Sequence, residues 1–188
     1  MPIDPTKTWR MVEERLGCES DPVRKRNLQT VLAHMKAEAA PDLDALMATV
    51  AENASYNAFG APDPLYSPQG KEAVRGFYTA FIASGAHRLE LDVDRLVVDE
   101  DCIVTEGVMR IAYPGTIVQL LGHAVDDPDA YYLFEARMAV FWPMDEHGLV
   151  IGEDTYTGGD GFAGIAERKL SSAELGTYSE VGALPRTH

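Results

Sequence analysis

Three side chains of this chain could transfer protons if folding brought them together. His34 lies on a predicted amphipathic helix, Tyr78 on the apolar face of another predicted helix, and Glu153 in a predicted strand. A glutamate that is buried beside a histidine has a raised pKa, and such a pair suits general acid/base catalysis near neutral pH. These residues predict proton transfer on an apolar, oxygen-bearing substrate, as in isomerisation, dehydration or cyclisation.

Two alternatives stay open for this predicted site. His34 could be a core histidine that is hydrogen-bonded to Tyr78 and to nothing else. A β-bulge that shifted the last strand by one residue would turn Asp154 inward in place of Glu153.

Helical patterns fill most of the first half of the chain and would position His34 and Tyr78. Asp21 and Pro22 have the form of an N-cap and a first helical residue, and apolar residues recur after them at helical spacing. Pro41 ends this helix, and a second helix begins next to it. The third helix carries Tyr78 among the apolar residues of its buried face, where the phenol hydroxyl needs a hydrogen-bond partner.

Strand patterns fill the second half of the chain. Apolar and polar residues alternate in two predicted hairpins, 89–113 and 131–157, and a short strand is predicted at 54–59. The stretches 60–70 and 114–130 are predicted loops. Helices followed by a strand meander predict an α+β fold in which the helices pack against one face of the sheet.

Three segments of the sequence resemble the nuclear transport factor 2-like superfamily, in its SnoaL-like and ketosteroid-isomerase-like branch. They are PDLDALMATVAENASYNAFG, GKEAVRGFYTAF and GLVIGEDTY, and the resemblance covers roughly positions 24–160. It implies a cone-shaped, curved, mixed and mainly antiparallel sheet that is wrapped around three helices. It also implies a pocket on the concave face and a homodimer through the convex face. We expect one domain over 1–188, with a core at about 22–160 and extensions at both ends.

The catalytic residues of the family's known enzymes are replaced in this sequence. The place of the isomerase base is taken by Ala58, and the acid that donates to the oxyanion falls near Met138 or Ala139. The arginine and aspartate of the limonene-epoxide-hydrolase branch fall on Gly107 and Met109. Since a proton shuttle needs a base, neither of these two reactions is expected.

Other positions keep features that the resemblance implies for a site. His34 aligns with the isomerase tyrosine that holds the oxyanion, and Tyr78 aligns with a tyrosine that supports it. With this alignment as anchor, strand alternation turns Glu153 inward. The remaining predicted pocket residues, mostly apolar or aromatic as in ordinary ligand sites, are Tyr56, Phe77, Met109, Val140, Trp142 and Thr155.

The opposite strand face carries charged side chains. Arg110, Glu135 and Arg137 alternate with apolar residues, as do Glu106 and Asp154. Opposite charges on neighbouring strands form cross-strand pairs without any substrate, so we interpret them as a polar interface on the convex face.

Composition excludes several classes of partner. The formal net charge of −14 opposes binding to nucleic acid and to anionic membranes, and no apolar run reaches bilayer length. Cys18 and Cys102 lie far apart and have neither disulfide-framework nor metal-ligand spacing, which favours a cytoplasmic protein. The string GGDGF lacks the context of a dinucleotide-binding turn. We expect no metal and no cofactor.

Three functions remain open from the sequence. The leading hypothesis is a cofactor-independent SnoaL-like enzyme, of isomerase, dehydratase or cyclase type, that acts on a small hydrophobic molecule related to steroids, terpenoids or polyketides. The first alternative is a non-catalytic module of the same fold that binds a ligand or a protein. The second is a subunit that pairs with a dioxygenase, as some members of the family do.

Overall fold

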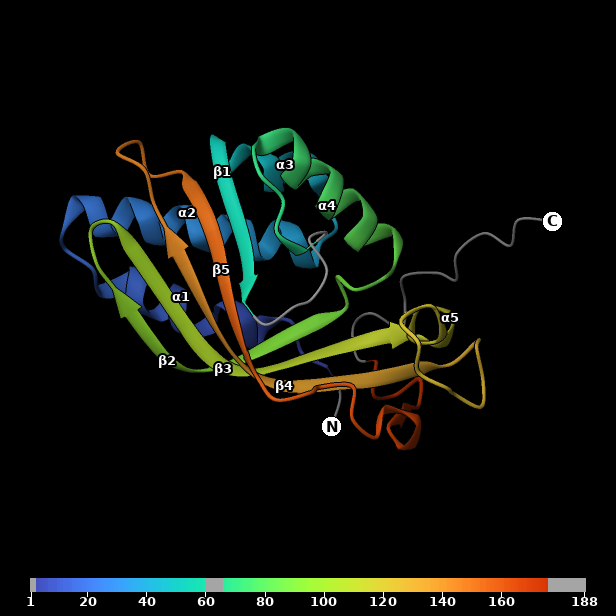
Figure 1. Cartoon of the computed structure of the whole chain (residues 1–188). Helices are drawn as coiled ribbons and strands as arrows, with labels where there is room; N and C mark the ends of the chain where they lie inside the picture. The colour runs from blue at the N-terminus through green and yellow to red at the C-terminus, as the bar shows by residue number, and fades with distance from the viewer. Residues whose placement is uncertain (1–2, 60–65, 176–188) are drawn as a thin grey trace.

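Helices and strands follow one another in the order that the sequence predicts. The computed structural model describes residues 3–59 and 66–175 (Figure 1). The helices in this part are α1 (Thr6–Cys18), α2 (Pro22–Ala39), α3 (Leu43–Ala48), α4 (Lys71–Ala83) and α5 (Gly115–Leu120). The strands are β1 (Val50–Phe59), β2 (Leu89–Val98), β3 (Cys102–Pro114), β4 (Tyr131–Pro143), β5 (Val150–Gly158) and β6 (Lys169–Leu170).

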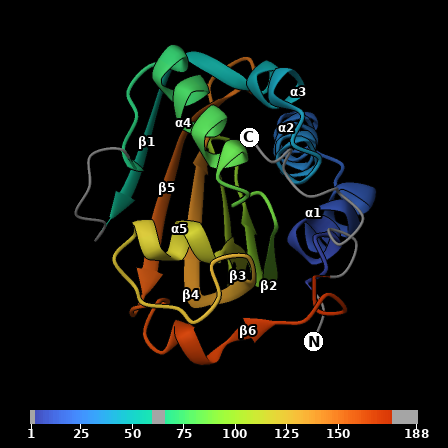
Figure 2. The same cartoon turned by 90° about the vertical axis from the view of Figure 1, so that its right-hand side faces the viewer.

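The strands form one curved, mixed sheet. Its order is β1-β5-β4-β3-β2, and the short strand β6 pairs with the N-terminal end of β4. All neighbours are antiparallel except β1 and β5, which run parallel. Helices α2, α3 and α4 lie on the concave side of this sheet (Figures 1 and 2). The predicted α+β fold, a curved sheet wrapped around helices, is confirmed.

The core between the helices and the sheet positions the predicted site. The Asp21 carboxylate accepts from the backbone N–H groups of Val23 and Arg24, so α2 begins at Pro22 as predicted. The buried face of α2 packs against the inward residues of β3 and β4. The largest core cluster combines Leu28, Val31 and Met35 of α2, Leu46 and Met47 of α3, Val74 and Tyr78 of α4, and Ile103, Val140 and Trp142 of the sheet.

A β-bulge in β2 bends the sheet where it wraps the helices. The pairing of β2 with β3 shifts between Val93 and Arg95, opposite Gly107. A Cβ atom on Gly107 would lie 2.1 Å from the carbonyl oxygen of Asp92 and 2.9 Å from Cα of Val93. Because these neighbours are backbone atoms, they cannot move aside by a change of rotamer. Only glycine fits the bulge at this position.

Replacing Gly107 by Ala is therefore expected to lower the free energy of unfolding by about 1–3 kcal/mol, the usual cost of overpacking. Gly76→Ala is the matched control, because no atom lies within 4 Å of a Cβ placed there in the middle of α4. The control should be neutral or more stable by up to about 1 kcal/mol, since alanine favours a helix. Urea unfolding of both variants measures the difference, and equal stability of Gly107→Ala and the parent would contradict this account.

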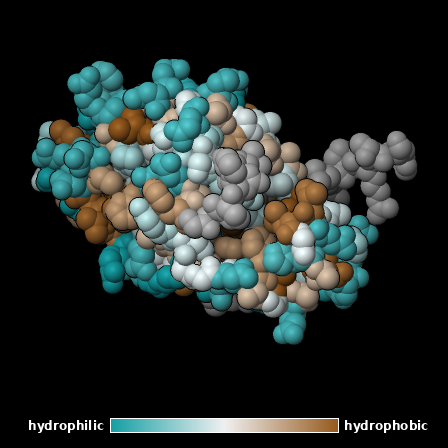
Figure 3. All heavy atoms as spheres, in the orientation of Figure 1, coloured by the Kyte–Doolittle hydropathy of each residue, from teal (hydrophilic) through white to brown (hydrophobic). Residues whose placement is uncertain are grey.

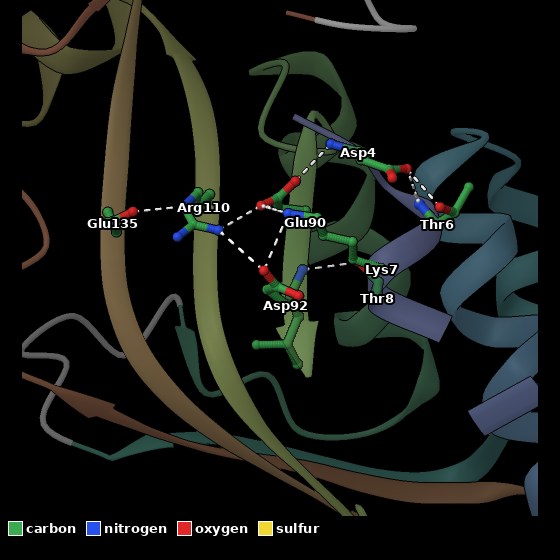
Figure 4. A network of polar contacts seen from close by, with 9 residues as sticks. Asp4, Thr6, Lys7, Thr8, Glu90, Asp92, Arg110 and Glu135 are labelled. Carbon is green, nitrogen blue, oxygen red and sulfur yellow. Dashed lines mark hydrogen bonds and ion pairs between the residues drawn. The ribbon is translucent and has the colours of Figure 1, made fainter. Parts of the chain in front are cut away.

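Helix α1 covers the free edge of β2. The backbone N–H of Leu91 donates to the Thr8 hydroxyl (2.9 Å), and the Lys7 ammonium group contacts the carboxylates of Glu90 (3.2 Å) and Asp92 (3.1 Å). Figure 4 shows these contacts continuing through Arg110 of β3. An edge strand exposes unpaired backbone groups. The N-terminal helix satisfies part of this edge and belongs to the packed structure.

Of the two stretches predicted as loops, one contains a helix and the other is described only in part. The insert 114–130 contains the helix α5, whose Val118 is buried against Tyr132 and Ile165. Of the stretch 60–70, residues 60–65 lie outside the described part of the chain, and Gln69 forms an isolated bridge with Ser55 of β1.

Candidate functional site

The structure brings His34, Tyr78 and Glu153 into one chain of hydrogen bonds. The Tyr78 hydroxyl lies 2.9 Å from Nε2 of His34 and 2.9 Å from a carboxyl oxygen of Glu153. On the other side of the imidazole, Nδ1 of His34 lies 2.7 Å from the hydroxyl of Thr49, the residue that ends α3. Residues from α2, α3, α4 and β5 thus meet at one point of the core.

Strand alternation decides which acid of β5 faces this point. Glu153 pairs with Tyr56 of β1 and lines a cavity on the concave side. Asp154 lies on the outer face, where it accepts a hydrogen bond from the side-chain amide of Asn57 (2.6 Å). Of the two acids that the sequence left open, the structure places Glu153 inward.

The protons in this chain can be arranged in two ways, because each hydroxyl has only one proton to donate. With a neutral Glu153, the carboxyl donates to Tyr78, and Tyr78 donates to Nε2 of His34. The Nδ1–H group of His34 then donates to Thr49, whose hydroxyl donates to the Leu46 carbonyl (2.6 Å). With an ionised Glu153, Tyr78 donates to the carboxylate and the Nε2–H group of His34 donates to Tyr78. If the Thr49 hydroxyl then donates to Nδ1 of His34, it gives up its hydrogen bond to the Leu46 carbonyl. Ionisation of Glu153 therefore changes the tautomer of His34 without charging it.

Burial sets the charge state of these groups. Burial raises the pKa of Glu153 to about 7, although hydrogen bonding from Tyr78 partly opposes this rise. Burial lowers the pKa of His34 to about 3, so this imidazole is neutral at physiological pH. The pKa of Tyr78 rises well above its ordinary value, first through burial and then through the charge of Glu153. Glu153 is thus the member of the chain that titrates near neutral pH.

Glu153 lines a cavity that has a deep part and an outer part. The deep cavity, of about 130 Å³, is lined by Glu153, Trp142 and Val140 among others. The outer pocket, of about 550 Å³, is lined by aromatic residues that include Tyr113, Phe134 and Phe162. The two parts share a wall of five residues, Phe77, Phe81, Ile111, Met138 and Thr155.

The dimensions and the lining of this cavity suit a small apolar molecule. Ligand pockets commonly measure about 300–1,000 Å³ and are mainly apolar with a few polar groups. The space-filling view shows a mostly hydrophilic face on which apolar surface gathers between the C-terminal end of α4 and α5 (Figure 3).

The predicted pocket residues divide into two groups. Phe77, Met109, Val140, Trp142 and Thr155 line the deep cavity together with Glu153. By contrast, Tyr56, Tyr78 and His34 are almost fully buried and lie outside the set of lining residues. We therefore treat His34 and Tyr78 as positioning residues for Glu153.

Sequence reasoning missed a second acid in the cavity wall. Glu38 lines the deep cavity and lies one helical turn after His34 on α2. The available signal was this spacing of four residues, which places both side chains on one face of the helix. In the sequence, Glu38 lies near the end of the helix beside the charged residue Lys36, and so resembles an ordinary surface acid.

The described lining of the cavity carries acids and no cation. Glu38 and Glu153 in the deep cavity and Asp160 in the outer pocket are its acidic residues, and none of the described lining residues is Lys, Arg or His. Within residues 3–59 and 66–175, no group of three or more His, Cys, Asp or Glu side chains could hold a metal ion. In the same ranges, no helix is long and apolar enough to span a bilayer.

Comparisons with known proteins agree with the fold. Two putative SnoaL-like polyketide cyclases are similar in structure. The one from Shewanella denitrificans OS-217 has a TM-score of 0.61 at 11% identity, over 78% of this chain and 98% of that chain. The one from Jannaschia sp. CCS1 has a TM-score of 0.56 at 20% identity, over 74% and 90%.

A third similar structure contains a ligand. RV0760c from Mycobacterium tuberculosis, solved in complex with estradiol-17beta-hemisuccinate, has a TM-score of 0.54 at 20% identity, over 70% of this chain and 92% of that chain. A search of curated protein sequences gives no match. A family model of the SnoaL-like domain matches residues 31–145, which is more than half of the chain. The chain therefore belongs to the SnoaL-like domain family.

Proposed function

We propose that this protein binds a neutral, apolar, oxygen-bearing molecule in its cavity and catalyses a proton transfer on it without a cofactor. The observation that carries this proposal is the Glu153 carboxyl in the wall of an apolar cavity, held by the Tyr78 hydroxyl at 2.9 Å. Burial raises the pKa of Glu153 to about 7. A carboxyl with such a pKa both accepts and releases protons readily near neutral pH.

The relatives support the proposed class of substrate. A SnoaL-like structural neighbour is described as a polyketide cyclase, and another binds a steroid hemisuccinate. The cavity offers such compounds a small deep part at Glu153 and a larger outer part with the aromatic residues Phe134 and Phe162. The supported reactions are isomerisation, dehydration or cyclisation of a steroid, terpenoid or polyketide-like molecule.

The charge of the cavity predicts a preference among such ligands. Above pH 7, neutral estradiol should raise the melting temperature more than estradiol-17β-hemisuccinate, because the ionised Glu153 carboxylate and the acid Asp160 repel a ligand carboxylate. A ligand at 100 times its Kd stabilises the folded state by about 2.7 kcal/mol. Thermal shift with this pair and with neutral steroid and decalin ketones tests the proposal. A larger shift with the hemisuccinate, or no shift with any neutral compound, would contradict it.

Ligand binding without catalysis is the second candidate function. It is favoured by the apolar residues at the places of the isomerase acid and base, where Ala58 lines the outer pocket and Met138 lines both parts of the cavity. The two candidates differ in what they require of Glu153, because binding alone needs no group that titrates near neutral pH.

The homodimer through the convex face stays a prediction. Phe59 and Tyr156 are exposed there and stack with their ring centroids 4.6 Å apart, and Phe141 contacts Tyr156. Around them, Arg110 pairs with Glu135 at 2.6 Å. Exposed aromatic rings among ion pairs are typical of protein interfaces, and the same surface would serve the alternative of a partner subunit.

A further inference from the structure

Tyr113 lies in the wall of the outer pocket, where neighbouring rings hold its phenol in place. It comes near the end of β3, two positions after Ile111, which lines the same pocket. Its ring centroid lies 6.2 Å from that of Phe134 on β4 and 5.6 Å from that of Phe162, in the turn after β5. Phe134 and Phe162 also contact each other edge to face, at 4.9 Å. Packing against two rings restricts the rotamer of Tyr113, so its hydroxyl has a defined position.

The hydroxyl group of Tyr113 is not used by the protein. Within the part of the chain that the structure describes, it forms no hydrogen bond. Tyr132, which pairs with Tyr113 across β4 and β3, shows the usual behaviour of a buried tyrosine. Its hydroxyl accepts from the backbone N–H of Asp127 (3.0 Å) and donates to the Asp126 carboxylate. Burial raises the pKa of Tyr113, so its hydroxyl keeps its proton at physiological pH and can donate it to a ligand.

The polar side chains of the cavity lie at different depths. Glu153 lines only the deep cavity, Thr155 lines both parts, and Tyr113 lines only the outer pocket. The Thr155 hydroxyl likewise forms no hydrogen bond among the described residues, so it is the competing donor for a ligand. The other hydroxyl groups of the outer pocket belong to Tyr66 and Thr157, which are exposed and can be solvated by water. Tyr113 therefore supplies the sheltered hydroxyl of the outer pocket.

We propose that Tyr113 is a specificity-determining residue, whose hydroxyl binds an oxygen atom at the end of the ligand remote from Glu153. This inference rests on the ligand-binding part of the proposed function. It narrows the substrate class to neutral apolar molecules that carry an oxygen function at each end. One oxygen belongs to the group that reacts at Glu153, and the other accepts a hydrogen bond from the Tyr113 hydroxyl or donates one to it.

The aromatic surroundings make this contact selective. An oxygen atom that is buried in an apolar pocket without a partner costs free energy, and so does an unpaired phenol hydroxyl. A ligand with an oxygen at this place satisfies both groups, whereas a ligand with only C–H groups there leaves the phenol unpaired. The acid Asp160 lines the same pocket and repels a carboxylate. The second oxygen function is therefore a ketone or an alcohol.

Tyr113→Phe tests first whether the hydroxyl is unused in the ligand-free protein. The variant keeps the ring contacts with Phe134 and Phe162 and removes only the hydroxyl. Its melting temperature should equal or exceed that of the parent, because no hydrogen bond is lost. Tyr131→Phe is the matched control, since Tyr131 is also partly buried but lines neither part of the cavity. A clear fall in Tyr113→Phe alone would show that the hydroxyl supports the fold and would overturn the proposal.

Three steroids that differ only at carbon C17 test the contact itself. 4-Androsten-3-one has no oxygen there, testosterone has a hydroxyl group, and 4-androstene-3,17-dione has a carbonyl group. Calorimetric titration of the parent should give a Kd about 5- to 10-fold lower for the two compounds with an oxygen at C17, which is the range of one hydrogen bond. Tyr113→Phe should abolish this difference. Tyr131→Phe and Thr155→Val should keep it.

The outcomes separate this contact from the proposed function. Equal Kd values for the three steroids in the parent would overturn the role of Tyr113 and leave the proposed function standing. A difference that survives in Tyr113→Phe, or that disappears in Thr155→Val instead, would do the same. A parent that binds none of the three steroids would contradict both the contact and the proposed function.

Exchange of the hydrogens next to the C3 carbonyl with solvent deuterium, followed by NMR, adds a kinetic readout. Tyr113→Phe should raise KM for testosterone and leave kcat unchanged, because the contact lies away from the reacting group. A fall in kcat with KM unchanged would overturn the assignment of Tyr113 to specificity. Binding in the expected pattern without any exchange by the parent would remove the catalytic function and keep the contact at Tyr113.

Discussion

Glu153→Gln is expected to lower kcat by about 10²–10⁴-fold, the usual contribution of a general acid or base. Gln has nearly the same shape and still pairs with the Tyr78 hydroxyl, which lies 2.9 Å from the Glu153 carboxyl. Ligand affinity should therefore change little, and the loss should appear in kcat. The measurement is turnover and thermal-shift binding with a neutral ketone that stabilises the parent.

Asp154→Asn is the matched control for this variant. Asp154 is the next residue of the same strand, but it lies on the outer face and contacts Asn57. The control should keep the turnover of the parent. Full turnover in Glu153→Gln would show that Glu153 is not the catalytic group, whereas equal losses in both variants would point to a change in the structure of β5.

The pH dependence of stability shows whether Glu153→Gln is correctly folded. The pKa of Glu153 is raised from 4.5 to about 7, so folding takes up a proton between these pH values. The stabilising effect of this proton is complete below pH 4.5 and is lost as the pH rises through 7. Above pH 7 the parent carries the cost of a buried carboxylate, up to about 3 kcal/mol, which Gln avoids. At pH 8 the variant should therefore melt at or above the temperature of the parent.

Trp142→Ala is expected to lower the free energy of unfolding by about 3–5 kcal/mol, the usual cost of removing a buried aromatic ring. Trp142 is 3% exposed, contacts the edge of the His34 ring at a centroid distance of 5.3 Å, and donates to the Thr105 hydroxyl (3.1 Å). Its loss would remove the ring that packs against His34 and add empty space to the deep cavity, which Trp142 lines. Urea unfolding measures the effect.

Phe141→Ala tests whether this cost comes from burial. Phe141 precedes Trp142 on β4 but points to the outer face, where it is 38% exposed and contacts Tyr156. Its removal should cost less than about 1.5 kcal/mol, the range of an aromatic pair. Similar losses in the two variants would mean that Trp142 does not hold the core in the way described.

The sequence predicted the elements whose signals are local. The Asp21-Pro22 start of α2 follows from capping chemistry, and the two long hairpins follow from alternation of apolar and polar residues. Strand alternation, with the family alignment as anchor, also indicated the inward position of Glu153, because one register places every second residue on the same face. A shift by one residue, which would have turned Asp154 inward, stayed open until the structure was known.

Features that depend on distant partners could not be predicted in the same way. The parallel pairing of β1 with β5 joins segments about 100 positions apart, and the first residues of β1, from Val50, read as the end of a helix. Helix α5 is six residues long, and a helix of that length depends on tertiary packing, here of Val118. Helical spacing places Glu38 and His34 on the same face of α2, but it does not show which of the two side chains reaches the cavity. In the structure, Glu38 lines the deep cavity and His34 lies outside the set of lining residues.

Helix α1 lies outside the residues that match the SnoaL-like domain, 31–145, yet it contributes Thr8 to the wall of the deep cavity. The same Thr8 hydroxyl satisfies the backbone of β2. A protein fragment trimmed to the matched region would lack α1 and β5, so it would lose Thr8 and Glu153 from the wall of the deep cavity and the cover of β2. We expect such a fragment to aggregate through the exposed edge of β2. The packed core thus extends beyond the residues that match the SnoaL-like domain.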